Sequence, residues 1–292
     1  MKEGQSSRTA AAAAALRANH FQHAANPVFA DPYAYDLTSQ RWQKILSSPQ
    51  LVKLMNSAAF NRTLGLLSGQ VVARSRYAED LLQHALVGHL DQYVLVGAGL
   101  DSFALRQSNL YPDLKIFEVD HPDTQAAKQH KLKQLGSVPA NVEFVAIDFE
   151  KESLGDALAR SGYDQTKAGF FSWLGTTHYL EPQTTLTTLK SIAAFAAPLS
   201  EVVLDYSIHY HELQGIERLG SFAVSQFTRF LREPLIGTFR PAALHSAVEE
   251  LGFNVIEDLS GDAISNRYFD QRPDHIRHTL ATRLLHLRLA KN

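Results

Sequence analysis

Five short apolar runs recur through the middle of the chain. Almost every position in them is apolar, and they are rich in Val, Ile and Phe: YVLVGAG, LKIFEVD, NVEFVAIDF, AGFFSWLG and EVVLDYS. Near-continuous apolar runs of this length are typical of strands buried on both faces of a parallel sheet. The segments between them can form helices. This alternation predicts right-handed crossovers and a doubly wound α/β fold with a mostly parallel sheet.

The flanking segments complete the predicted architecture. Residues 1–90 are predicted to be helical, including the alanine run Ala10–Ala15, because alanine is among the best helix formers. We expect them to cap a second unit, residues 91–292. There, RPAALHSAVEELGFNVIEDLS predicts a helix ending at Gly252 and then a strand. HTLATRLLHLRLA predicts a further strand, which gives a seven-stranded sheet. Residues 208–238 do not fit the alternation and are expected to form a lid above the carboxyl edge.

Composition narrows the classes of function. The 292 residues carry a formal net charge of -2 and contain no cysteine, which excludes disulfides, thiolate nucleophiles and cysteine-ligated metals. Lys and Arg are scattered, so we expect no nucleic-acid partner. No run approaches the roughly 20 apolar residues of a membrane span, and a cytoplasmic location is the default expectation. His209 and His211 lack a nearby third ligand, so no metal is expected. A homodimer is left open.

The first apolar run ends in a glycine turn. Gly97 and Gly99 stand where a strand should give way to a helix, and glycine there lets a ligand approach the main chain. Asp120 ends the second run, 21 positions after Gly99, a spacing that suits an acceptor for ribose hydroxyls. The dinucleotide fingerprint would place a third glycine where Ser102 stands. The turn therefore indicates a nucleoside cofactor, with S-adenosylmethionine and a nicotinamide dinucleotide as alternatives.

Two segments together carry a family resemblance. VLVGAGLDSFALR (94–106) followed by FEVDHPDTQAAK (117–128) resembles the leucine carboxyl methyltransferase-like family of class I S-adenosylmethionine-dependent methyltransferases. That family includes protein phosphatase carboxyl methyltransferases and polyketide carboxyl methyltransferases of the tetracenomycin type. SRTAAAAAALRANH, RSRYAED and FNVIEDLS extend the resemblance over most of the chain. It implies a Rossmann-like class I methyltransferase fold with S-adenosyl-L-methionine as cofactor and S-adenosyl-L-homocysteine as product.

The resemblance also implies cofactor contacts. Arg74 matches the arginine that holds the methionine carboxylate, a role that suits a forked guanidinium. Asp120 matches the ribose ligand. Asp148 and Phe149 match the pair beside adenine. The complete predicted cofactor set is Arg74, Gly97, Gly99, Asp101, Asp120, Asp148, Phe149 and Leu174.

One segment departs from the family's pattern. Many relatives have Glu-Gly shortly before Tyr-Leu after the fourth strand, whereas this chain reads SWLGTTHYL, with Leu174 at the position of the glutamate. A subset of relatives reads Ser-Trp-Leu-Gly-Val-Thr-x-Tyr-Leu. We therefore expect the cofactor site to be retained, and the glutamate's role is not transferred to this chain.

The acceptor decides which side chains the chemistry needs. An ionised carboxylate is already a nucleophile and needs positioning and desolvation more than a base. A phenol would need a base, and His178 in GTTHYL is the best-placed catalytic candidate, with packing at a helix start as the alternative. Aromatic residues after the strands suit a flat acceptor. The predicted acceptor pocket comprises Trp173, Tyr179, Tyr206, His209 and Tyr210.

The sequence thus predicts an S-adenosylmethionine-dependent O-methyltransferase. The expected acceptor is a carboxylate or a phenol of a small molecule, with a secondary metabolite as a candidate. Three alternatives are kept: an NAD(P)-dependent oxidoreductase on a similar fold, a non-catalytic relative that binds the cofactor, and methylation of a protein carboxyl terminus.

Overall fold

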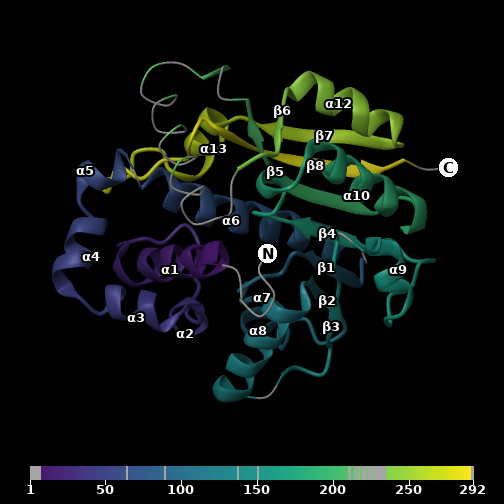
Figure 1. Ribbon diagram of the computed structural model, residues 1–292, viewed down its shortest axis with the longest axis horizontal. Helices are drawn as coiled ribbons and strands as arrows, with labels where there is room; N and C mark the ends of the chain where they lie inside the picture. Colours follow the sequence, from purple (N-terminus) through teal and green to yellow (C-terminus); the bar gives the residue numbers. More distant parts are fainter. Residues whose placement is uncertain are drawn as a thin grey trace.

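A single mixed sheet forms the centre of the molecule, with helices on both faces (Figure 1). The computed structural model describes residues 8–290, except for most of residues 210–234 and four single positions, Leu64, His89, Ser137 and Glu150. The strands of the described residues are β1 (Gln92–Val96), β2 (Lys115–Asp120), β3 (Val142–Ala146), β4 (Phe170–Trp173), β5 (Glu201–Ile208), β6 (Thr238–Phe239), β7 (Phe253–Leu259) and β8 (Thr282–Leu289).

The strand order places the switch point of the sheet between β1 and β4. The order is β3-β2-β1-β4-β5-β8-β7, and β6 pairs with β5. Strands β1 to β5 are parallel to their neighbours among themselves, while β8 runs antiparallel between β5 and β7. The chain thus winds outward in both directions from β1 and β4. Ligands of open α/β sheets bind beyond the carboxyl ends of the strands at such a point.

The doubly wound α/β prediction is confirmed, with one difference in strand number. The described sheet has eight strands rather than seven, because Thr238 and Phe239 pair with Ser207 and Ile208 as the short strand β6. Two residues are too few to form an apolar run, so no periodic pattern could predict this strand. Most of the predicted lid, residues 208–238, lies outside the described residues.

Two hydrophobic clusters fill the space between the sheet and its helices. One cluster packs β-strand side chains such as Trp173 and Tyr206 against helices α9, α10 and α12, and the other packs the opposite faces of the strands against α6, α7 and α13. The helices of these two layers are α6 (Leu66–Val87), α7 (Phe103–Gln107), α9 (Leu154–Ala159), α10 (Pro182–Phe195), α12 (Pro241–Glu250) and α13 (Gly261–Tyr268).

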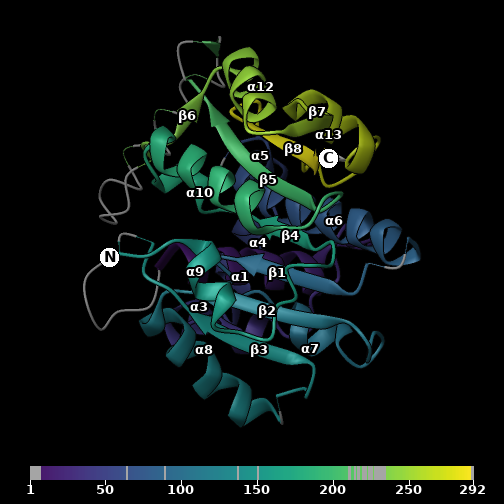
Figure 2. The same cartoon turned by 90° about the vertical axis from the view of Figure 1, so that its right-hand side faces the viewer.

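The amino-terminal segment is helical, and no strand is found among its described residues. Five helices gather at the carboxyl ends of the parallel strands, at the left in Figure 1 and behind the sheet in Figure 2. Helix α1 packs on α2, α3 and α6, and α2 reaches helix α8 (Pro122–Leu135). Their bounds are α1 (Arg8–His23), α2 (Ala34–Leu37), α3 (Gln40–Leu46), α4 (Pro49–Met55) and α5 (Ala58–Asn61).

Candidate active site

The glycine turn after β1 lies at the predicted edge. Gly97 and Gly99 have φ of +68° and +50°, in the region that favours glycine. The N–H groups of Gly97 and Ala98 donate to the carbonyl of Val119 on β2, at 2.8 and 3.0 Å. A Cβ at Gly97 would lie 2.5 Å from Thr176 Cγ2. The turn is therefore held close to the loop after β4, at the carboxyl edge of the sheet.

Asp120 is bound into the same turn. One carboxylate oxygen accepts from the N–H of Gly99 and the other from the N–H of His121, at 2.6 Å in the second case. Burial raises the pKa of Asp120, and these two N–H donors oppose that effect. Each oxygen of a carboxylate can accept a second hydrogen bond. The side chain is thus fixed and keeps two acceptor positions, which is what a ribose diol requires.

Arg74 meets Asp205 at the carboxyl ends of β4 and β5. Arg74 Nη1, from α6, donates to Asp205 Oδ2 at 3.0 Å, and the N–H of Gly175 donates to Asp205 Oδ1 at 2.6 Å. Burial alone would raise the pKa of Asp205, but the charges of His178 and Arg74 and the Gly175 N–H hold it well below its usual range. Asp205 is therefore an ionised acceptor inside the protein.

His178 shares the same carboxylate. It lies in the short helix η1 (Thr177–Tyr179), and its Nε2 is 2.9 Å from Asp205 Oδ2, while its Nδ1 is 2.8 Å from Ser207 Oγ. Because a carboxylate only accepts, the proton in the first bond belongs to Nε2. Gln70 Nε2, one turn before Arg74 on α6, lies 3.5 Å from His178 Nε2. Both ring nitrogens of His178 are therefore engaged.

A second histidine lies beside this cluster. His278, in the loop before β8, donates from Nδ1 to the carbonyl of Thr279 at 2.7 Å, which leaves a lone pair on Nε2. Among the described residues that Nε2 has no hydrogen-bond partner, although it is buried. Burial lowers the pKa of His278 to about 4, so the ring is neutral at pH 7. The negative charge of Asp205 raises the pKa of His278 and the positive charge of Arg74 lowers it, so both groups lie close enough to interact with the ring.

The predicted adenine pair follows β3. The N–H of Ile147 donates to the carbonyl of Asp120, which places Asp148 and Phe149 beside the end of β2. Asp148 pairs with Lys151 at 2.8 Å, and Phe149 packs partly buried against the sheet core. In the turn itself, Asp101 Oδ1 accepts from the N–H of Phe103 at 2.7 Å. These positions agree with a nucleoside that runs from β1 across the end of β2 towards β3.

Helix α1 is fastened to the glycine turn by a buried arginine. Arg17 Nη2 donates to the carbonyl of Leu100 at 2.6 Å, and its Nε donates to Asp31 at 2.8 Å. Ala10 Cβ lies 3.4 Å from the position of a Cβ on Gly99. The amino-terminal helices thus cover this side of the turn. The small side chains of the alanine run allow the close approach.

The residues predicted to line the acceptor pocket do not lie together in the structure. Tyr206 and Asp205 are neighbours on β5 and point to opposite faces of the sheet. Tyr206 donates to Asp258 at 2.8 Å, and both Tyr206 and Trp173 are fully buried in the core cluster of α9, α10 and α12. They do not meet Arg74. Leu174 packs partly buried on the α6 face, Tyr179 and His209 lie half-buried after β4 and β5, and Tyr210 lies outside the described residues.

Sequence reasoning missed Asp205, Gly175 and His278. Asp205 is hidden in an apolar strand as EVVLDYS, where a strand-terminal acid carries no spacing rule of its own. Gly175 has φ of +75°, and a Cβ there would lie 2.4 Å from Arg74 Nη2. His278 sits in a loop with no pattern. A signal existed only for Asp205, as an acid near the carboxyl end of a predicted central strand.

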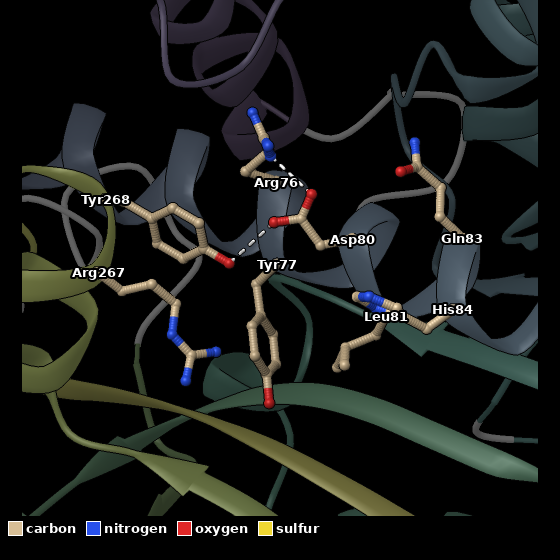
Figure 3. Close-up of a pocket in the computed structure, with 8 residues that line it drawn as sticks. All are labelled: Arg76, Tyr77, Asp80, Leu81, Gln83, His84, Arg267 and Tyr268. Carbon is tan, nitrogen blue, oxygen red and sulfur yellow. Dashed lines mark hydrogen bonds and ion pairs between the residues drawn. The ribbon is translucent and has the colours of Figure 1, made fainter.

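A separate pocket of about 350 Å³ lies along the second half of α6, beside Arg267 and Tyr268 of α13 (Figure 3). It begins near Arg76 and follows α6 towards Val87, from which the chain continues to the amino end of β1. Its polar groups bind one another: Arg76 and Tyr268 donate to Asp80, and Tyr77 donates to Glu257, which also binds Arg267. This pocket does not include the glycine turn, so it is not the nucleoside site.

Among the described residues, no three or more histidine, cysteine, aspartate or glutamate side chains are grouped so that they could hold a metal ion. None of the described helices combines the length and the apolarity needed to cross a membrane.

The residues at this edge fit S-adenosylmethionine. Its ribose diol, adenine and amino-acid end need a paired acceptor, an apolar wall with a nearby acceptor, and a forked cation. Asp120, the Asp148–Phe149 pair and Arg74 provide these chemical groups around the strand ends. Gly97 and Gly99, both at positive φ, form the sharp turn that lies between these groups.

Comparisons with known proteins agree with this fit. The model of the family described as "Leucine carboxyl methyltransferase" matches residues 10–193. The Bacillus subtilis (strain 168) protein "Putative S-adenosyl-L-methionine-dependent methyltransferase YktD" is 29% identical over 297 residues, covering 94% of this chain and 95% of that protein. A second relative, a "Putative S-adenosyl-L-methionine-dependent methyltransferase" of Mycolicibacterium gilvum (strain PYR-GCK), is 27% identical, covering 62% of this chain and 60% of that protein.

The fold likeness is broader than the sequence likeness. A crystal structure of a "putative methyltransferase" from Thermobifida fusca YX superposes with a TM-score of 0.59 at 12% identity, covering 88% of this chain and 93% of that one. The family match covers well over half of the chain, and it decides between the two nucleoside cofactors in favour of S-adenosylmethionine. The chain belongs to the leucine carboxyl methyltransferase family and is an S-adenosylmethionine-dependent methyltransferase.

Proposed function

We propose that the protein is an O-methyltransferase that methylates a carboxylate of a small molecule. The observation that supports this most directly is the state of the two histidines beside Arg74. His178 has both ring nitrogens engaged, and burial lowers the pKa of His278 to about 4, which makes its free Nε2 a weak base. Neither is suited to remove a proton at neutral pH. An acceptor that is already ionised does not need one.

The reaction then balances without a protein base. S-adenosylmethionine, when bound, would supply an electrophilic methyl group on a sulfonium, and the electron pair of the S–C bond would stay on sulfur. A carboxylate oxygen of the acceptor would take the methyl group through its own lone pair, so the protein would have no proton to remove. The protein's contribution is to place the two reactants in line and to exclude water. The family description, which names a leucine carboxyl group, supports the same acceptor chemistry.

The proposed roles follow from the placements above. Arg74 holds the methionine carboxylate, Asp120 the ribose, and Asp148 with Phe149 the adenine. Gly97 and Gly99 let the cofactor lie against the main chain, with Asp101 and Leu174 beside it. Tyr179 and His209 are proposed for the acceptor side. His178 is assigned to structure around Asp205 rather than to proton transfer.

A labelling experiment tests the acceptor. The purified protein is incubated with methyl-labelled S-adenosylmethionine and a panel of aromatic carboxylic acids, with phenols of the same skeletons run beside them. A methyl ester releases labelled methanol in mild alkali, whereas an aryl methyl ether keeps its label. We expect alkali-labile label from carboxylic acids. Alkali-stable label from phenols would contradict the carboxylate proposal, and label on carboxyl-terminal peptides alone would contradict a small-molecule acceptor.

A further inference from the structure

The guanidinium of Arg74 is fixed from two sides. Asp205 Oδ2 accepts from Nη1 at 3.0 Å, and the main chain of Gly175 lies over the guanidinium plane so closely that a Cβ there would be 2.4 Å from Nη2 and 2.7 Å from Cζ. The Arg74 side chain is only 14% exposed. The ion pair with Asp205 and the close main chain of Gly175 thus hold the Arg74 guanidinium in one orientation.

This arrangement leaves part of the arginine unused. Among the described residues, Arg74 Nε and Nη2 make no hydrogen bond, while Nη1 is occupied by Asp205. A guanidinium binds a carboxylate best through two parallel N–H donors. Asp205 therefore takes one donor of the fork and leaves others for a ligand. The amino-acid end of the cofactor is the ligand group of matching charge at this edge.

Asp205 is itself held in place by three other donors. Gly175 N–H donates to Oδ1 at 2.6 Å, His178 Nε2 shares Oδ2 at 2.9 Å, and the Thr177 hydroxyl donates to the main-chain carbonyl. The other groups that face this cluster are Gln70 on α6, Ser207 on β5 and the neutral His278 before β8. These donors hold the Asp205 carboxylate in one position, so a movement of Arg74 would break the ion pair instead of shifting the carboxylate.

We propose that Asp205, together with the Gly175 main chain, positions Arg74 for the methionine carboxylate of the cofactor. Asp205 does not touch the cofactor in this scheme and acts through the arginine. The proposal rests on the proposed role of Arg74 as the carboxylate ligand. It makes the amino-acid end of the cofactor, and not its nucleoside, depend on a residue in the middle of the sheet.

Two ligands distinguish binding of the amino-acid end of the cofactor from binding of its nucleoside. S-adenosylhomocysteine carries the amino-acid group, and 5′-methylthioadenosine has the same adenosine and thioether without it. Calorimetric dissociation constants for both are compared in the full-length protein and in Asp205→Asn, a near-isosteric change that turns an acceptor towards two donors into an amide. We expect S-adenosylhomocysteine to bind about 10- to 100-fold more weakly to the variant. We expect 5′-methylthioadenosine to bind within about twofold of the unaltered protein.

A matched control uses another buried aspartate of the same sheet. Asp258 on β7 also accepts from an arginine and a histidine, but on the opposite face. Asp258→Asn should leave the ratio of the two dissociation constants unchanged. If Asp205→Asn weakens both ligands equally, its role is structural and the proposal is overturned; if it weakens neither, the proposal is also overturned.

Arg74→Ala separates this proposal from the site assignment beneath it. If Arg74→Ala leaves S-adenosylhomocysteine binding unchanged, the arginine is not the carboxylate ligand and the proposed role of Arg74 fails. If Arg74→Ala weakens binding and Asp205→Asn does not, only the positioning role fails. In the double variant, Asp205→Asn should add no further loss, because its effect passes through Arg74.

Gly175→Ala provides a second route should Asp205→Asn not fold. The added Cβ would displace the guanidinium without removing a charge from the cluster. The same selective loss of S-adenosylhomocysteine is expected. Unchanged binding of both ligands in folded Gly175→Ala would contradict the claim that the orientation of Arg74 matters.

Discussion

Two buried aspartates of one sheet receive similar donors and serve different ends. Asp205 accepts from Arg74, His178 and a main-chain N–H, and Asp258 accepts from Arg283, His245 and Tyr206. Arg283 gives two of its groups to Asp258, one to the side chain and one to the carbonyl. Arg74 keeps Nε and Nη2 unoccupied among the described residues.

This contrast indicates that hydrogen-bond donors without partners are better evidence for a binding site than charge alone. The Asp258 cluster lies at the outer strands, and its arginine donates twice to Asp258. The Asp205 cluster lies beside the switch point of the sheet, and its arginine keeps donors without a partner among the described residues. Within the part of the chain that the structure describes, the buried His278 Nε2 beside this cluster also has no hydrogen-bond partner. Buried polar atoms without partners are uncommon in proteins and call for a ligand, a water molecule or a functional explanation.

Removing each carboxylate gives the largest expected contrast. Asp205→Ala strands Arg74 and His178 in a nearly water-free setting, and breaking a buried pair costs about 3–5 kcal/mol of unfolding free energy. Asp258→Ala should cost about 1–2 kcal/mol, because the His245 and Arg283 side chains are 32% and 22% exposed and can be hydrated. Urea unfolding at pH 7.5 measures both. Equal losses would remove the contrast.

The second contrast concerns pH and His278. Burial lowers the pKa of His278 in the folded protein to about 4, against 6.5 in the unfolded chain. The unfolded state therefore binds a proton first, and folding stability falls as the pH drops from about 6.5 to about 4, by up to about 3 kcal/mol from this residue.

His278→Gln should remove that part of the acid loss. The measurement compares unfolding free energies at pH 7.5 and pH 5, and the variant should lose less between the two than the unaltered protein. Taking the difference between pH values cancels any constant cost of the substitution. Asp205, whose pKa is depressed, loses its contribution only below the usual range of a carboxyl, so the two effects separate. Parallel pH curves for both proteins would show that His278 is not held neutral.

The third contrast exchanges each arginine for lysine. Lysine keeps the charge but cannot present a fork, so Arg74→Lys should weaken S-adenosylhomocysteine binding about tenfold, or about 1.4 kcal/mol. Arg283→Lys should change it less than about twofold, since Arg283 binds Asp258 and Tyr206 on the opposite face of the sheet. Calorimetric titration of both variants decides. A large effect at Arg283 would mean that the two clusters communicate across the sheet.

Periodicity and turn chemistry predicted the frame of the molecule well for physical reasons. Val94 to Val96 are apolar throughout, and Phe170 to Trp173 are apolar except for Ser172, because both faces of their strands are covered. Gly97 and Gly99 are forced by positive φ, which few other residues tolerate. Asp120 sits at the carboxyl end of its strand, which is the position proposed for the ribose ligand. Each of these features is local, so each leaves a local trace in the sequence.

The acceptor side could not be read in the same way. Trp173, Tyr206 and His178 all lie at or near the carboxyl ends of strands, and only the pleat and the loop geometry decide which face each takes. Alternation sends Asp205 to the α6 face and Tyr206 to the opposite one. His278 reaches the cluster from a loop 100 residues beyond His178, a contact without any sequence signature. Long-range placement, rather than residue type, was the missing information.

The smallest expected effect tests the placement of Tyr206. Tyr206→Phe removes one donor to Asp258 and should cost about 1 kcal/mol of unfolding free energy, because His245 and Arg283 still satisfy the carboxylate. Since the phenol faces the core of α12 and not Arg74, the KM for the methyl acceptor should change less than about twofold. Steady-state kinetics with a carboxylic acid acceptor measure it. A tenfold rise in that KM, with cofactor affinity unchanged, would show that the acceptor reaches the far face of the sheet and that the aromatic pocket predicted from the sequence includes Tyr206 after all.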